Sequence, residues 1–299
     1  MNYFIQYTIN GLTAGAFYAL VALGYTIVYG IVRLINFAHG DLTMVGAFAG
    51  WTILVSLGLD KIPVALAITL AVLFAMLVTS TINVGILTFA YRPLFKKSLL
   101  AILITALGMS LLLQNAALNI FGATIQPYPH LLGAAGVDFA EVRASYKQIV
   151  FFGISCALMV VLYVFTQFTT IGVAMRALAV DHDAARLMGI NVDRIIAVAF
   201  ILGAVMAAAA GVMFGLYYTQ IDFFMGFLVG LRAFTSAVLG GIGNIPGAMA
   251  GGLLIGLLES YAAALNLGRW QDVLVFGVLI AVLIVKPTGL FGERVAERM

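Results

Sequence analysis

Charged residues are scarce in this chain of 299 residues. Asp, Glu, Lys and Arg make up only 9% of the sequence, whereas 64% is hydrophobic and the mean hydropathy is +1.13. A soluble domain has about 25% charged residues, so the composition excludes that class. The apolar runs exceed the roughly 20 residues that a helix needs to cross a bilayer, and they recur along the whole chain. The sequence therefore predicts an integral membrane protein.

Other absences narrow the class. Segments of about 10 residues with alternating hydrophobicity, which mark an outer-membrane β-barrel, are missing, so we expect an all-α polytopic bundle. The single cysteine, Cys156, allows no internal disulfide. No Lys or Arg precedes Arg33, so the start of the chain lacks the basic region of a cleavable signal peptide. We expect the first span to be retained.

Signatures of enzymes and of bound cofactors are also missing. The sequence holds no G-x-x-x-x-G-K-[ST] loop to hold nucleotide phosphates, so an ATP-driven motor would be a separate polypeptide. No paired Ser-His-Asp or Cys-His signature is present, and we do not expect an enzyme. Asp181, His182 and Asp183 form a D-H-D run without a second cluster, which we interpret as a polar helix start. We expect neither a metal nor another cofactor on this chain.

The apolar runs predict a single transmembrane domain over residues 1–299, with about eight to ten helical crossings. The candidate crossings are residues 4–29, 41–58, 63–90, 99–121, 148–170, 195–218, 228–242, 246–265 and 270–290. Between the pair 228–242 and 246–265, the stretch LGGIGNIPG (239–247) holds four glycines, an Asn and Pro246, which interrupt the helix. Broken helices are therefore expected within the bundle.

Clusters of Lys and Arg predict the orientation. Basic residues gather in YRPLFKKS (91–98), at Arg176, Arg186 and Arg194, and in the tail at Lys286, Arg294 and Arg298. Cytoplasmic loops carry an excess of these residues, so we place all three segments in the cytoplasm, and the net charge of +3 does not imply nucleic acid. The same count places the N-terminus and the loop 122–147 outside.

The most charged stretch, VDHDAARLMGINVDR (180–194), lies between two apolar runs. Asp181 is a candidate N-cap, Asp183 lies in the first turn, and Gly189 suits the position after the last turn, which predicts a helix of about two turns. Asp183 and Arg186 are spaced to pair, while Ala184, Leu187 and Met188 form a small apolar face, and Asn191 or Asp193 can cap the next helix. Both an ordinary solvated loop helix and a docking helix for a soluble motor fit this pattern.

Two glycine-rich elements echo each other and predict an internal repeat. GDLTMVGAFAG (40–50) and GNIPGAMAGG (243–252) each have a polar, helix-breaking entry followed by G-A-x-A-G. Repeat-built transporters place such elements near the membrane midplane, facing the substrate route. The candidate pathway residues are Asn36, His39, Asp41, Gly240, Gly241, Gly243 and Asn244. Asn36, His39 and Asp41 could instead fix a re-entrant turn by hydrogen bonding to unwound backbone.

Small residues also recur at four-residue spacing, which is typical of close helix packing. We interpret these glycine pairs as packing positions: Gly11 and Gly15, Gly211 and Gly215, Gly226 and Gly230, Gly252 and Gly256.

Several stretches resemble, in the same order along the chain, permeases of the branched-chain amino acid ABC importer family, LivH type. They are residues 10–48, 91–115, AARLMGINVDRIIAVAFILGAVMAAAAGVMFG (184–215), FTSAVLGGIGNIPGAMAGGLLIGLLE (234–259) and KPTGLFG (286–292). The resemblance implies two permease subunits, the second a homologous LivM-like chain, in the inner membrane of a bacterial cell. It also implies two ATPases, which hold ATP and Mg, and an extracytoplasmic substrate-binding protein.

By the same resemblance, residues 176–194 would be the cytoplasmic coupling segment, in which residues 181–191 would dock into an ATPase groove. Its implied contact residues are Asp181, Asp183, Ala185, Arg186, Leu187, Met188, Gly189 and Asn191.

The substrate assignment rests on resemblance alone. It implies branched-chain or other hydrophobic amino acids, but similar permeases also handle urea and short amides. An ion-coupled secondary carrier and a passive channel also stay open. Carriers usually show ionisable residues deep in their spans, and here the interior candidates are few: His39, Asp41, Asp222, Arg232 and Glu259.

Overall fold

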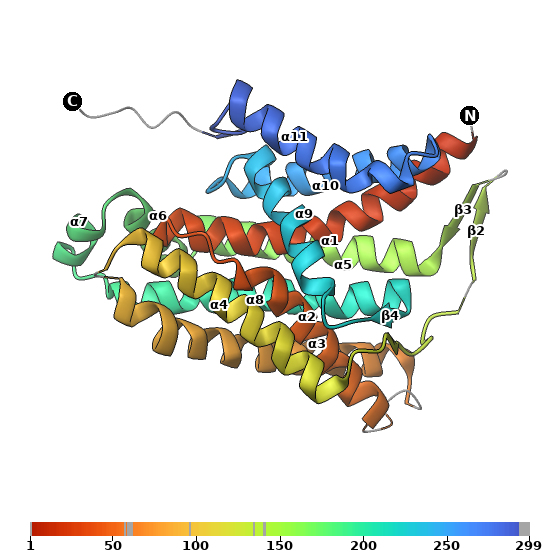
Figure 1. The fold of residues 1–299 in the computed structure, drawn as a ribbon, viewed down its shortest axis with the longest axis horizontal. Coiled ribbons are helices and arrows are strands. Elements are labelled where there is room, and N and C mark those ends of the chain that lie inside the picture. The colour runs from red at the N-terminus through yellow and green to blue at the C-terminus, as the bar shows by residue number, and fades with distance from the viewer. Residues whose placement is uncertain are drawn as a thin grey trace.

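The computed structural model of the protein describes residues 2–56, 58, 62–95, 97–133, 135–139 and 142–292. Lys96, Arg294 and Arg298 of the predicted basic segments lie outside the described residues. The long helices run roughly along one axis of the molecule (Figure 1). In chain order the helices are α1 (Asn2–Val32), α2 (Ala38–Trp51), η1 (Thr52–Ser56), α3 (Val64–Gly85), η3 (Ile86–Tyr91), η4 (Arg92–Leu94), α4 (Leu99–Phe121), α5 (Tyr146–Phe168), α6 (Thr170–Val180), α7 (His182–Leu187), α8 (Val192–Tyr218), α9 (Met225–Gly240), α10 (Ile245–Ala264), η5 (Gly268–Trp270) and α11 (Gln271–Val285).

The all-α class is confirmed. Within the described residues, seven helices are long and apolar enough to cross a membrane. The predicted crossings 41–58 and 228–242 correspond to the shorter helices α2 and α9, of 14 and 16 residues. The predicted crossing 148–170 corresponds to α5, after which the chain breaks at Thr169 and continues as the separate helix α6.

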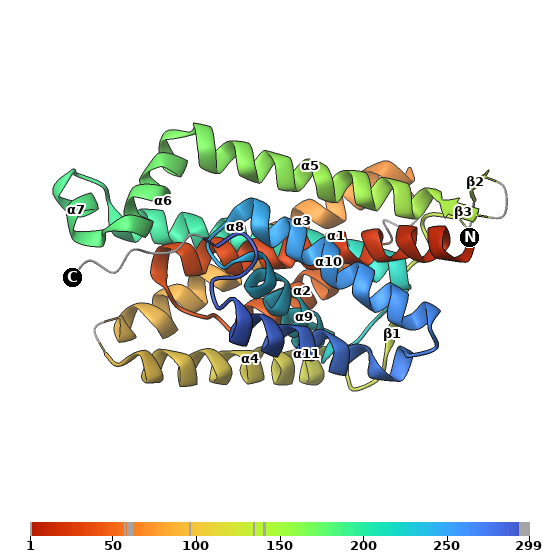
Figure 2. The same ribbon diagram turned by 90° about the horizontal axis from the view of Figure 1, so that it is seen from above.

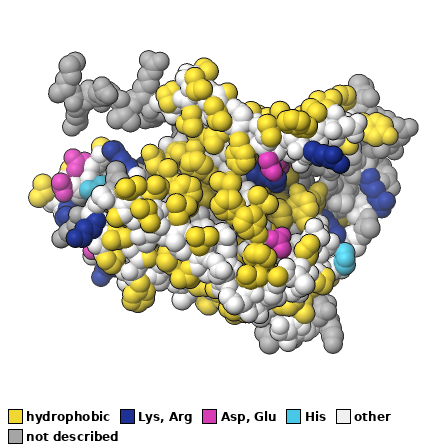
Figure 3. Space-filling model, viewed as in Figure 1, with side chains coloured by type: hydrophobic (Ala, Val, Ile, Leu, Met, Phe, Trp, Pro, Cys, Tyr) yellow, Lys and Arg dark blue, Asp and Glu magenta, His cyan; other side chains and the backbone are white. Residues whose placement is uncertain are grey.

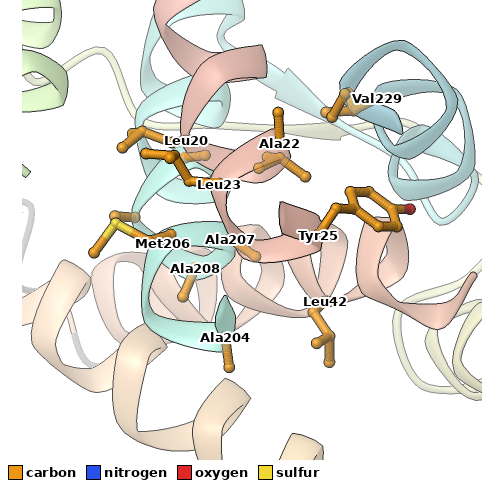
Figure 4. Packing of buried hydrophobic residues seen from close by; sticks show 14 of the residues in the cluster. Leu20, Ala22, Leu23, Tyr25, Leu42, Ala204, Met206, Ala207, Ala208 and Val229 are labelled. Atoms are coloured by element: carbon orange, nitrogen blue, oxygen red, sulfur yellow. The ribbon is translucent and has the colours of Figure 1, made fainter. Parts of the chain in front are cut away.

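Helix α1 lies at the centre of the bundle and packs against α2, α5, α8, α9 and α10. From Ala16 to Leu23 every side chain is at most 2% exposed. Figure 4 shows Leu20 and Leu23 on the side of α1 that carries Met206 of α8, and Tyr25 on the side of α9. Small residues at helix interfaces allow close approach in a membrane, and Gly11 and Gly15 of α1 lie directly against α10, which suits this central position.

Glycine brings α1 into backbone contact with α10. A Cβ atom on Gly15 would lie 2.8 Å from the carbonyl oxygen of Gly252, and one on Gly252 would lie 2.5 Å from the backbone nitrogen of Ala19. Similarly, a Cβ on Gly230 of α9 would lie 2.6 Å from the Cα of Gly40 in α2. Any side chain would therefore push these helices apart. The packing interpretation of the glycine pairs is confirmed.

The basic segments gather at one end of the molecule, since η4, α6 and α7 lie together there (Figures 1 and 2). The N-terminus of α1 lies at the opposite end, beside an antiparallel pair of strands in the predicted outer loop, β2 (Gly136–Phe139) and β3 (Val142–Ser145). There the backbone N–H of Arg143 donates to the Gln6 side chain at 2.9 Å. A second pair, β1 (Gln126–Pro127) and β4 (Gln220–Ile221), joins this loop to the end of α8. The grouping agrees with the predicted orientation.

We expect Gly252→Ile to destabilise the bundle by about 2 kcal/mol or more, because the new side chain must displace the α1 backbone. The measurement is the thermal midpoint of the detergent-purified protein. Gly153→Ile on α5 is the matched control, since nothing lies within 4 Å of its Cβ position. Equal midpoints for the two variants would contradict the close contact of α1 and α10.

Candidate coupling and translocation sites

Helix α7 begins at the predicted cap. The Asp181 carboxylate accepts from the backbone N–H groups of Asp183 and Ala184 at 2.8 and 3.0 Å. These N–H groups have no partner within the helix, so the carboxylate satisfies them and also interacts favourably with the helix dipole. The N-cap prediction is confirmed.

The other end of α7 closes as the sequence predicts. Gly189 has φ of +82°, in the left-handed region that favours glycine, and the N–H of Ile190 donates back to the carbonyl of Ala185 at 3.1 Å. Asn191, rather than Asp193, caps α8 by accepting from the N–H of Arg194 at 3.1 Å. The predicted coupling segment thus contains a short helix, α7, with both ends fixed by hydrogen bonds.

The tip of α7 presents apolar side chains to the outside. Leu187 and Met188 are 89% and 83% exposed, whereas Ala185 is buried against the rest of the chain. Asp183 and Arg186 pair at 4.0 Å, but both are exposed, so the pair adds little stability. The exposed Leu187 and Met188 therefore form a surface that a partner can cover.

Three arginines tie this end of the molecule together through backbone carbonyls. Arg33 at the end of α1 donates to Ala179 in α6 at 3.4 Å, and Arg92 of η4 donates to Asp193 in α8 at 3.1 Å. Arg176 of α6 donates to the carbonyl of Thr166 in α5. These hydrogen bonds connect α6 to α1 and α5, and η4 to the start of α8.

A groove of about 820 Å³ lies beside α7. Its polar lining comes from both predicted basic segments, and the rest is apolar. The charged or titratable residues in the lining are Arg92, Lys97, His182, Arg186 and Asp193.

The entry to α2 is built from buried polar groups near the middle of the bundle. The Tyr91 hydroxyl donates to the Asn36 side-chain oxygen at 2.6 Å. His39 is fully buried against Gly24 of α1 and Gly203 of α8, and its ring lies 4.7 Å from that of Tyr25 in an edge-to-face arrangement. Both residues are enclosed by protein groups in this conformation.

Asp41 is also fully buried, and helix α4 supplies its partners. The Ser110 hydroxyl and the Gln114 amide donate to its two carboxylate oxygens at 2.5 and 3.1 Å. A buried carboxylate is costly unless it is hydrogen-bonded, so this contact holds α4 against α2. Asn36 and Asp41 thus bond side chains of η3 and α4, whereas His39 packs against α1 and α8, and both the turn-fixing role and direct contact with a substrate stay predictions. The four-residue spacing of Ser110 and Gln114 within an apolar run was the available signal.

The second glycine-rich turn lies elsewhere than expected. Gly241 and Gly243 have φ of +105° and +98°, and the Asn244 side chain caps α10 by accepting from Gly247 at 2.9 Å. Gly243 lies beside Gly30, close to the end of α1, so the midplane placement of this turn is wrong.

Residues of the C-terminal KPTGLFG stretch close this turn. The N–H groups of Leu290 and Phe291 donate to the carbonyls of Leu239 and Gly240 at 2.8 and 3.0 Å. The Asn244 side chain donates to the Phe291 carbonyl at 2.9 Å. The predicted pathway residues Gly240, Gly241, Gly243 and Asn244 thus lie against this stretch.

Comparison with known proteins assigns the family. Residues 7–283 match the sequence profile described as "Branched-chain amino acid transport system / permease component". The chain belongs to this family. The permease is 43% identical to BraD of Pseudomonas aeruginosa, a high-affinity branched-chain amino acid transport system permease protein, over 99% of this chain and 98% of that protein. It is 40% identical to LivH of Escherichia coli, named in the same way, over the same shares of the two chains.

A solved structure shares the fold of the permease. A chain of PsaBC from Streptococcus pneumoniae, in complex with Fab, superposes with a TM-score of 0.51 at 14% identity, covering 96% of this chain and 93% of that one. The relatives are transport permease subunits, and the permease is a multi-pass membrane protein whose family implies ATPase and binding-protein partners. Within the described residues, no group of three or more His, Cys, Asp or Glu side chains could hold a metal.

We expect Asp181→Ala to loosen α7 in the isolated permease, because it leaves two backbone N–H groups without their acceptor. The cost is about 1 kcal/mol, which corresponds to about fivefold faster hydrogen exchange at the α7 amides. Mass spectrometry of exchanged peptides measures this. Asp183→Ala is the control, since that side chain is 92% exposed and caps nothing. Unchanged exchange in Asp181→Ala would show that the cap does not hold the helix.

Proposed function

We propose that this permease is the membrane subunit of an ABC importer that carries branched-chain and other hydrophobic amino acids across the bacterial inner membrane. The substrate class is supported by its 43% and 40% identity, over nearly the full length, to two permeases named for branched-chain amino acid transport. Delivery of the substrate by an extracytoplasmic binding protein, at the end that carries the N-terminus and β2–β3, is part of the proposal.

The observation that carries the proposal is the exposed tip of α7. An apolar patch on a helix whose ends are both capped suits insertion into a groove of another protein. We place one of two cytoplasmic ATPases there, with contacts from Leu187, Met188 and Arg186, and with the groove beside α7 as part of the contact surface. ATP and Mg²⁺ are held by the ATPases, because this sequence has no phosphate-binding loop of its own.

The arginine ties indicate how ATPase movement would reach the membrane. When two ATPases close on ATP, α7 moves as a rigid body together with α6. Arg176 and Arg33 pass that movement to α5 and α1, while Asn191 begins α8 directly after α7. The route between two permease subunits then changes shape. The ATPases supply the energy, and this chain transmits it.

The second permease subunit has a candidate surface on α4, α9 and α11. Figure 2 shows α4 and α11 on one long side of the bundle and α5 on the other. Outward residues of α5 between Gly153 and Val164 are all apolar or aromatic, as lipid requires, whereas α4 exposes Asn115 and Asn119. Polar groups within a span face protein or water. We therefore place a homologous, LivM-like subunit against α4, α9 and α11.

We expect Leu187→Glu and Arg186→Glu each to reduce the ATPase that co-purifies with the permease by about tenfold or more, since central interface residues contribute about 2 kcal/mol. Leu267→Glu, 40% exposed in the loop between α10 and α11, is the control and retains the ATPase. The same complexes in vesicles test transport. ATP-dependent uptake of leucine, lost in both α7 variants, supports the proposal. Uptake of urea instead, or of leucine without an ATPase, would overturn it.

For the partner surface, we expect a cysteine at position 115 to cross-link to the second permease, and a cysteine at position 161 not to do so. Both are introduced in a Cys156→Ser background, as Asn115→Cys on α4 and Val161→Cys on α5, because both side chains are exposed. A bismaleimide reagent and the mass of the adduct identify the partner. Cross-linking from α5 alone would place the second subunit on the opposite side.

A further inference from the structure

A cluster of ionisable side chains lies among α1, α9, α10 and α11. Arg232 contacts Glu259 at 2.9 Å through its Nε and Asp272 at 2.8 Å through its Nη2. The Tyr18 hydroxyl donates to the other oxygen of Glu259 at 2.7 Å and lies 3.2 Å from Nη1 of Arg232. Tyr18 and Glu259 are buried in the span, where unpaired charges are costly.

Three of these residues line a cavity of about 420 Å³: Tyr18, Arg232 and Glu259. The remaining lining comes from one end of each helix, such as Asn10 of α1, Tyr217 and Tyr218 of α8, and Gln271 of α11. That end carries the N-terminus and β2–β3 (Figure 1). The cavity is within the size range of sites for small molecules, about 300–1,000 Å³. It is therefore placed where a solute arrives from outside.

An ion cluster that served only to hold the helices together would use all of its hydrogen-bonding groups on protein. Here it does not. A guanidinium has five N–H donors, and the hydrogen bonds of Arg232 with Tyr18 and Asp272 use two of them, while its Nε forms an ion pair with Glu259. The Oε2 atom of Glu259 accepts from Tyr18 and has a further lone pair, and Oε1 has only the ion-pair contact with Arg232. Opposite charges at the cavity wall thus keep free capacity for a ligand.

The charges and the surrounding aromatic groups fit one ligand class. Arg232 suits a carboxylate, which it can bind with two parallel N–H groups, and Glu259 suits an ammonium group. Phe214, Tyr217 and Tyr218 supply an apolar wall for a side chain. Figure 3, drawn on the face of α4, α9 and α11, shows acidic and basic side chains within a largely apolar surface. A lipid-facing surface would not carry such a group.

We propose that this cavity binds the zwitterionic head of an amino acid on its way in, with the α-carboxylate on Arg232 and the α-ammonium on Glu259. The proposal rests on the proposed function, because it presumes that amino acids are the cargo. It adds a site within this subunit that recognises the head group and leaves the side chain to the aromatic wall. Tyr18 positions Glu259 through its hydrogen bond, and Asp272 positions Arg232.

The test uses the complete permease and ATPase complex in lipid nanodiscs, without nucleotide and without binding protein. Saturation-transfer NMR measures the affinity of leucine, of leucinamide, which lacks the carboxylate, and of isocaproate, which lacks the ammonium group. The wild type is expected to bind leucine about tenfold more tightly than either analogue, the difference made by one charged hydrogen-bonded pair.

Two variants, Glu259→Gln and Arg232→Gln, are each expected to lose the preference for leucine over one of the two analogues, and the analogue differs between them. Glu259→Gln lowers the affinity for leucine to that for isocaproate and leaves isocaproate unchanged. Arg232→Gln lowers the affinity for leucine to that for leucinamide and leaves the affinity for leucinamide unchanged. Arg269→Gln is the matched control, an exposed cation of η5 that does not line the cavity, and it leaves all affinities unchanged. Glu259→Gln has nearly the same shape as the native residue and carries the test alone if Arg232→Gln does not fold.

A cluster with a purely structural role would give another result. Both variants would then weaken all three ligands equally, or none of them, and the proposal would be overturned. ATP-dependent uptake of leucine by the wild-type complex distinguishes failure of the cavity proposal from failure of the proposed function. Uptake without the expected loss of these preferences rejects the cavity alone, whereas absence of leucine uptake and binding rejects the proposed function together with it.

Discussion

Backbone contact at glycine holds α1 inside the bundle, and the positions of the neighbouring helices follow from that contact. Association of helices in lipid gains nothing from expelling water, so it depends on close approach and on satisfied polar groups. Gly15 and Gly252 allow that approach between α1 and α10, and Gly40 and Gly230 allow it between α2 and α9. With α1 enclosed, α3, α5 and α11 are left at the periphery with much of their surface exposed.

Polar groups inside this frame divide into two kinds. Asp41 has both carboxylate oxygens occupied by α4, and Asn36 accepts from Tyr91, so these groups connect α4 and η3 with the entry to α2. Arg232 and Glu259 are paired with each other but border a cavity, and each keeps hydrogen-bonding capacity that protein groups do not use. Buried charge alone therefore does not identify a ligand site. Its position beside an open volume makes the difference.

Local hydrogen bonds decide which features the sequence could predict. The cap at Asp181, the left-handed Gly189 and the cap at Asn191 depend on residues within a few positions, and all three are present. The end of α5 was placed close to Phe168, but the separate helix α6 after Thr169 was not predicted. Placement of the turn at Gly243 was wrong, since it depends on residues about 45 positions away that pair with the end of α9. Ser110 and Gln114 could be noticed as a pair, but their partner Asp41 comes from another helix.

The hydrogen bonds that three arginines form beside α7 have a consequence for sequence variation. Arg33, Arg92 and Arg176 all donate to main-chain carbonyls, which every amino acid possesses. The acceptor positions Ala179, Asp193 and Thr166 can therefore accept other residues without losing the bond, provided that the backbone keeps its path. The acceptor of each hydrogen bond therefore does not depend on the side chain at its position. Residues at these acceptor positions can thus change while the hydrogen bonds between the helices are kept.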